Sequence, residues 1–136
     1  RWDLAILDEG WSRTRRSRTW AVDPSAPGKA GRTLFDRSSE DAYGDPGSFE
    51  TTVNAFGRPV LITTADGRHG YLAGAGASPE GDRPFLRRHN LTTNKQTQEI
   101  WRSGNTSASF TETVAALWKS LRRRCVSRRE TPTLSR

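Results

Sequence analysis

The chain has 136 residues, of which 32% are hydrophobic and 27% are charged, and it contains no Met. That length suits a single domain with a thin core, and a chain that begins Arg-Trp-Asp-Leu is expected to be an internal fragment of a longer protein. No apolar run is long enough to cross a membrane, so no membrane partner is expected, and the single Cys125 excludes an intrachain disulfide.

The first third of the chain predicts three strands. Short apolar runs at residues 4–8, 18–23 and 32–36 are separated by a polar connection and by the Pro- and Gly-rich segment 24–31. Apolar runs of this length between Pro and Gly turns are typical of antiparallel strands that follow one another in sequence order. Residues 1–38 are therefore expected to form a meander.

A long polar loop is expected next, and it carries three carboxylates. Glu40, Asp41 and Asp45 precede the turn at Pro46-Gly47. A calcium loop needs oxygen ligands at alternate positions around a central Gly and a late Glu, and that alternation is missing. No metal site is expected here.

Four further strands are predicted after this loop. The hairpin signal Asp66-Gly67 separates the first two of them, because Asp-Gly between apolar runs favours a tight turn. The four runs lie at residues 59–64, 70–73, 85–91 and 97–103. The described pattern is that of an all-β chain built from antiparallel sheets.

Residues 110–126 allow two interpretations. Ser109 and Glu112 match a helix capping box, and the apolar residues that follow lie on one face of a helix. The alternative is a pair of strands at 112–117 and 124–128 around a charged turn. Local sequence alone favours the helix.

No catalytic or nucleotide-binding motif is complete. A nucleophile elbow needs Gly two positions on either side of its Ser, whereas Pro79 and Glu80 follow Ser78. Gly74-Ala-Gly76 lacks the third glycine of a dinucleotide loop. His69 and His89 have no nucleophile to serve and are interpreted as surface or strand residues. The sequence predicts no catalytic residue and no cofactor in this chain.

The net charge of +7 is concentrated in the tail. Residues 1–118 carry 15 Lys or Arg and 14 Asp or Glu, whereas residues 119–136 carry 7 and 1. The tail includes Arg122, Arg123, Arg124, Arg128 and Arg129. Basic residues in a cluster can bind phosphates, so a basic nucleic-acid-binding module is the alternative function, although no known binding module accompanies the charge.

A second arginine cluster lies between two tryptophans. It consists of Arg13, Arg15, Arg16 and Arg18, flanked by Trp11 and Trp20. Guanidinium groups beside aromatic rings could bind phosphates and stack bases. The competing interpretation is ion pairing with carboxylates on neighbouring strands, which the strand pattern favours.

Several sequence blocks occur in an order that is informative as a whole. They lie at residues 14–20, 34–41, 44–47, 74–86, 100–103, 112–117 and 127–133. Together these blocks resemble the N-terminal β-propeller of the glutamyl endopeptidases, a branch of the prolyl oligopeptidase superfamily of serine peptidases. The resemblance covers almost the whole chain, except that residues 119–125 depart from the family pattern.

The resemblance implies part of a propeller of about two four-stranded antiparallel blades. The implied division is a blade set at 1–38, a long loop at 39–58, a blade at 59–103 and the start of another blade at 109–136, with strands at 112–117. In this family the propeller limits access to an active site whose Ser, Asp and His lie in a C-terminal α/β-hydrolase domain. That domain is absent here, so none of its catalytic residues can be assigned.

The resemblance also implies partners and a location. The partners would be peptide substrates and the catalytic domain of the same protein, in a chloroplast stroma or a bacterial cytoplasm. A peptidase that prefers glutamate needs cations for the substrate carboxylate, and Arg15 and Arg16 are the hypothesised substrate-binding residues. No cofactor is implied.

Overall fold

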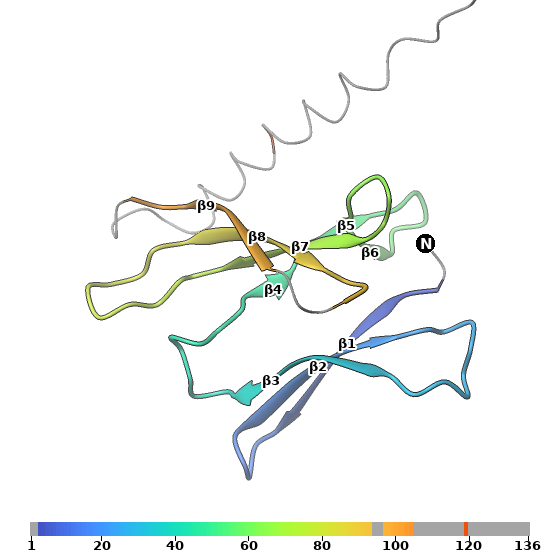
Figure 1. Ribbon diagram of the computed structural model, residues 1–136, viewed down its shortest axis with the longest axis horizontal. Helices are drawn as coiled ribbons and strands as arrows, with labels where there is room; N and C mark the ends of the chain where they lie inside the picture. Colours follow the sequence, from blue (N-terminus) through green and yellow to red (C-terminus); the bar gives the residue numbers. More distant parts are fainter. Residues whose placement is uncertain (1–2, 94–96, 105–118, 120–136) are drawn as a thin grey trace, which may run out of the picture.

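The computed structural model describes residues 3–93, 97–104 and 119, and every regular element within 3–93 and 97–104 is a β-strand (Figure 1). The prediction of an all-β chain with several antiparallel sheets is confirmed. The choice between helix and strands at residues 110–126, and the blade start at 109–136, fall outside the described residues except for Lys119.

The first sheet is the predicted meander. Its strands pair antiparallel in the order β1-β2-β3, with Leu7 opposite Trp20 and Arg18 opposite Asp36. They are β1 (Ala5–Trp11), β2 (Arg16–Val22) and β3 (Arg32–Ser38). A register shift between Thr19 and Trp20 leaves Leu34 as an extra residue on β3. Such a bulge explains how the consecutive residues Leu34 and Phe35 both reach the core.

The second sheet has four strands in the order β4-β7-β8-β9. These are β4 (Ser48–Phe49), β7 (His69–Gly74), β8 (Phe85–Asn90) and β9 (Thr97–Arg102). Leu72, Phe85 and Leu86 are among its fully buried side chains. This sheet therefore supplies the larger part of the core.

The segment expected as a loop at 39–58 contains two strands. One is β4, and the other is β5 (Thr51–Val53), which pairs with β6 (Pro59–Leu61) as a separate hairpin. The expected pairing of residues 59–64 with 70–73 is reduced to a single bridge between Thr63 and Gly70. β4 takes the place beside β7 because Phe49 packs there against the other sheet.

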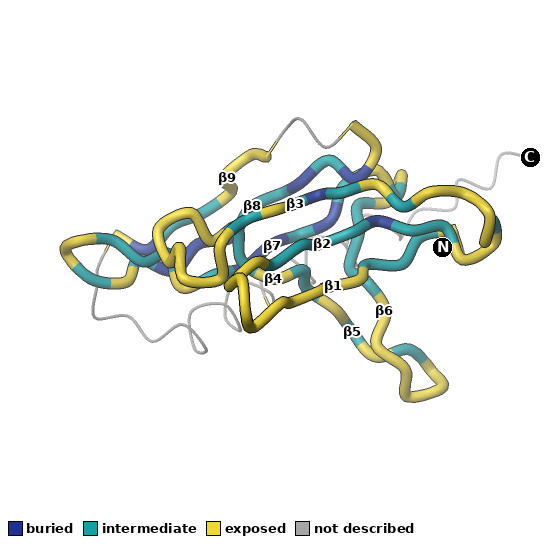
Figure 2. The backbone as a smooth tube through the Cα atoms, turned by 90° about the horizontal axis from the view of Figure 1, so that it is seen from below, coloured by how far each residue is buried: buried dark blue, intermediate teal, exposed yellow. Residues whose placement is uncertain are grey.

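The two sheets lie face to face. Figure 2 shows β1 over β4, β2 over β7 and β3 over β8. The ring of Phe35 lies 4.9 Å from that of His89 and 6.2 Å from that of Phe49. Arg32 on β3 donates to the carbonyl oxygens of Leu91 and Thr92 after β8. Aromatic packing and these hydrogen bonds thus join the sheets.

Candidate functional site

The predicted substrate-binding residue Arg16 lies at the start of β2 and is engaged by a carboxylate. Its Nε and Nη2 donate to the two Asp36 oxygens at 2.8 and 2.7 Å. Arg18 Nε donates to the same carboxylate at 3.0 Å. The hydrogen bonds from Arg16, and then those from Arg18, lower the pKa of Asp36 to about 2. Arg16 thus forms an ion pair with a carboxylate on a neighbouring strand, which is the competing interpretation of the arginine cluster.

The tryptophans of the arginine cluster pack on Arg18. Its guanidinium carbon lies 5.4 Å from the ring centre of Trp11 and 5.8 Å from that of Trp20. The indole N–H of Trp20 donates to Glu9 Oε2 at 2.7 Å. The aromatic and cationic groups on this outer face of the first sheet therefore interact with each other.

Arg15 is placed differently from Arg16. It lies in the β1–β2 turn with a φ of 52°, and its carbonyl accepts hydrogen bonds from the N–H and the hydroxyl of Ser39. Its Nε lies 3.5 Å from Glu40, with the Arg15 side chain 63% exposed. Exposed pairs of this kind contribute little, so Arg15 can exchange its partner at small cost. Substrate binding by Arg15 and Arg16 stays a prediction.

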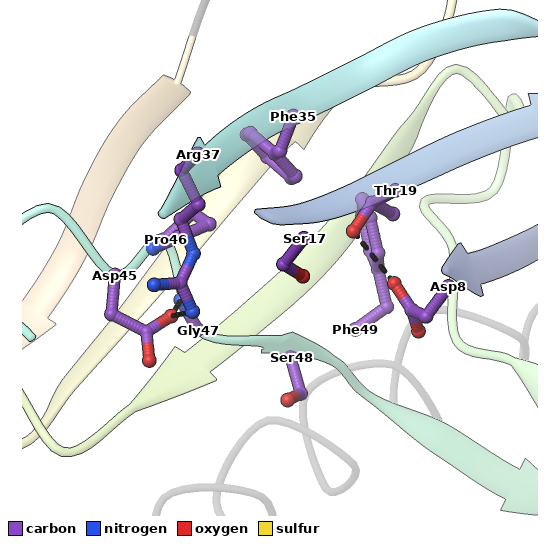
Figure 3. A pocket seen from close by; sticks show the side chains of 10 residues that line it. All are labelled: Asp8, Ser17, Thr19, Phe35, Arg37, Asp45, Pro46, Gly47, Ser48 and Phe49. Carbon is purple, nitrogen blue, oxygen red and sulfur yellow. Dashed lines mark hydrogen bonds and ion pairs between the residues drawn. The ribbon is translucent and has the colours of Figure 1, made fainter. Parts of the chain in front are cut away.

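A cavity of about 180 Å³ lies between the two sheets (Figure 3). It is lined by Asp8 of β1, Ser17 and Thr19 of β2, Phe35 and Arg37 of β3, and the segment from Asp45 to Phe49 that leads into β4. Most of these residues are polar. The cavity is thus a hydrophilic space beside the aromatic contact that joins the sheets.

Arg37 closes one side of the cavity. Its Nη2 lies 3.0 Å from Asp45 Oδ1, and its Nη1 donates to the carbonyls of Ser38 and Asp41 at 3.0 and 3.1 Å. The N–H of Gly47 also donates to Asp45 Oδ1, at 2.9 Å. This set of bonds fixes the chain where it crosses from β3 to β4.

Asp8 and Ser17 occupy the other parts of the lining. The Thr19 hydroxyl donates to Asp8 Oδ1 at 2.6 Å, and the Ser17 side chain points from β2 toward β4 (Figure 3). Asp8 and Asp45 outnumber the single guanidinium of Arg37, so the lining has a net negative charge. The sequence does not predict this cavity, because its lining residues come from four separate segments of the chain.

Ser78 and His89, which belong to no complete catalytic motif, have structural roles. The Ser78 hydroxyl donates to the Gly81 carbonyl at 2.6 Å within a turn. His89 is a strand residue of β8, 2% exposed, with Nδ1 2.7 Å from the Thr97 hydroxyl oxygen. Ser78 and His89 are thus held by local contacts.

No group of three or more His, Cys, Asp or Glu side chains in residues 3–93 and 97–104 is arranged to hold a metal ion. No helix in the part of the chain that the structure describes is long and apolar enough to span a membrane.

Comparison with known proteins gives two related sequences. The chain is 39% identical, over 84% of its length, to a protein named probable glutamyl endopeptidase, chloroplastic, from Arabidopsis thaliana. It has the same identity and coverage with a protein of that name from Oryza sativa subsp. japonica. The match spans 12% of the length of each relative. No family model and no solved structure matches the chain.

Proposed function

We propose that this chain is part of the β-propeller of a serine endopeptidase of the prolyl oligopeptidase superfamily, similar to glutamyl endopeptidase. The observation that carries the proposal is the 39% identity to two proteins of that name across most of the chain. The first and second sheets would be neighbouring blades of the propeller. Their face-to-face packing and antiparallel order support this assignment.

In this proposal the propeller limits which substrates reach an active site elsewhere in the longer protein. Hydrolysis itself would belong to Ser, Asp and His residues of a separate α/β-hydrolase domain. The match to only 12% of each relative is consistent with a chain that holds part of the whole. The residues of this chain would restrict the size of the substrates that reach the active site, and none of them would be a catalytic residue.

A comparison of substrate sizes tests the gating role. The longer protein should cleave a short peptide after Glu much faster than it cleaves a large unfolded protein of the same composition. Loosening the joint between the sheets by His89→Ala should narrow that difference, while a Tyr43→Ala variant should retain it. Equal cleavage of both substrates by the unaltered protein would contradict a gate.

The role of Arg15 and Arg16 in glutamate binding can be tested in the same protein. Because Arg15 has only an exposed contact with Glu40, Arg15→Ala should lower kcat/KM for a Glu substrate about tenfold if a charge-assisted contact is lost. The same variant should leave a Gln substrate unaffected. Unchanged cleavage after Glu in both Arg15→Ala and Arg16→Ala would remove these residues from substrate binding.

A further inference from the structure

The strand segment from Ser48 to Val53 has an open edge. β4 is at the end of the four-stranded sheet, and β5 pairs only with β6, so no strand among the described residues lies along their outer side. Natural proteins protect such edges with Lys, Pro or several charges. This segment contains Glu50 as its one charged residue and has neither Lys nor Pro.

The main-chain groups on this edge face outward at alternate residues. The Glu50 N–H donates to the Tyr71 carbonyl at 2.8 Å, and the Glu50 carbonyl accepts from the Ile62 N–H. The Asn54 N–H donates to the Arg58 carbonyl at 2.9 Å. Glu50 and Asn54 therefore bond toward the body of the sheet. In an antiparallel ladder the residues between them alternate, which turns the N–H and C=O of Thr51 and Val53 to the open side.

The cavity between the sheets adjoins the beginning of this edge. Gly47, Ser48 and Phe49 form its floor, and Asp8 of the edge strand β1 lies across from them. A strand added beside β4 would direct alternate side chains between the two sheets, on the side to which Phe49 points. A volume of about 180 Å³ accommodates one such side chain.

The charge of the lining determines which side chain fits. Asp8 accepts from Thr19 through Oδ1, and Asp45 contacts Arg37 and Gly47 through Oδ1. Within residues 3–93 and 97–104, the second oxygen of each carboxylate has no hydrogen-bond partner. Those oxygens suit the cationic end of a basic side chain.

We propose that this edge and cavity form a docking site for an extended peptide segment that carries a basic side chain. The peptide main chain pairs with Thr51 and Val53, and one Lys or Arg enters the cavity beside Asp8 and Asp45. Main-chain pairing supplies affinity in this mode of recognition, and the side-chain pocket supplies specificity. The site goes beyond the proposed peptidase function, since neither the hydrolase domain nor cleavage enters it.

The test uses the 136-residue chain and three fluorescein-labelled, end-capped peptides of alternating Thr and Val. The peptides differ at one position, which is Lys, norleucine or Glu. Fluorescence anisotropy should give affinities in the order Lys, norleucine, Glu, with Lys about tenfold tighter than Glu. The net charge of the chain is +7, so non-specific attraction predicts the opposite order.

Two variants separate the edge from the cavity. Thr51→Pro removes an outward N–H that β6 does not use, and it should weaken the binding of all three peptides about fivefold, whereas Thr51→Ala should not. Asp8→Asn keeps an oxygen for the Thr19 hydroxyl but removes the charge. It should abolish the preference for Lys over norleucine and leave the affinity for norleucine unchanged.

Three results would overturn the proposal. They are the absence of saturable binding by any of the peptides, a preference for Glu over Lys, and affinities in Thr51→Pro equal to those of the unaltered chain. If the edge instead pairs with a second copy, sedimentation should show a dimer that Thr51→Pro dissociates and that the peptides do not displace. A failed peptide test leaves the peptidase proposal standing, because substrate cleavage is measured separately.

Discussion

Asp36 links β3 to β2 on the outer face of the first sheet. Its carboxylate receives hydrogen bonds from Arg16 and Arg18, which hold its pKa at about 2 against an ordinary value of 3.8. A carboxyl group whose folded pKa is lowered stabilises the fold above its unfolded pKa, and that contribution is lost as pH falls through the folded value. Asp36 therefore contributes stability at neutral pH.

We expect Asp36→Asn to lower the free energy of unfolding at pH 7. The difference from the unaltered chain should shrink between pH 3.8 and about pH 2, because Asp36 becomes protonated there. Urea unfolding at a series of pH values measures this difference. Glu80→Gln is the matched control, since Glu80 is exposed and has no ion pair among the described residues. A pH-independent effect of Asp36→Asn would contradict the argument.

Gly47 and Gly57 provide a matched pair for backbone conformation. Both have positive φ, 83° and 74°. A Cβ on Gly47 would lie 2.4 Å from the Ala73 carbonyl oxygen, whereas a Cβ on Gly57 would meet nothing within 4 Å. Gly57→Ala should cost about 1 kcal/mol for φ alone, and Gly47→Ala about 3 kcal/mol or more. Equal losses in chemical unfolding would show that the contact with Ala73 is unimportant.

Sequence reasoning at the residue scale was limited by register. The sequence favours pairing of the arginine cluster with carboxylates on neighbouring strands, but it does not single out Asp36 as the partner. Its position opposite Arg18 depends on the register shift between Thr19 and Trp20, which makes Leu34 an extra residue on β3. The cavity could not be predicted from the sequence either. Asp8 and Asp45 line it together only when both sheets have formed.

The contact that joins the two sheets is made by aromatic rings on β3, β4 and β8. His89 is 2% exposed and its ring contacts Phe35 and Phe49. His89→Ala should lower the free energy of unfolding by about 2–4 kcal/mol, because it leaves a cavity in the core. Tyr43→Ala, at a residue that is 70% exposed, should change it by less than about 0.5 kcal/mol. Similar losses in thermal unfolding would contradict this assignment of the joint.

The strands that could be predicted are those with their own apolar pattern. β2, β3, β7 and β8 each combine apolar residues with flanking Gly, Pro or Asp turns, so local sequence indicates them. β4 has two residues, and Phe49 is its one apolar side chain. Its pairing beside β7 depends on the contact of Phe49 with the other sheet, which lies far away in sequence.

At the scale of the whole molecule, the core is small, and no described strand covers the outer face of the first sheet. Two small clusters hold five of the buried hydrophobic residues, and Leu7 and Trp11 on the outer face of the first sheet are exposed. If this chain belongs to a propeller, a neighbouring sheet covers that face. Amide hydrogens of β1 and β2 should then exchange more slowly in the longer protein than in the isolated chain. Equal exchange rates in both would argue against such a neighbour.

We propose above all that this chain is part of a serine peptidase whose catalytic centre lies outside residues 1–136. The most direct measurement is labelling of the longer protein with a fluorophosphonate, followed by peptide mapping. We predict one labelled serine, located outside residues 1–136, and loss of cleavage after Glu once it is labelled. A protein that takes no label, or a label on Ser78 within this chain, would contradict the account.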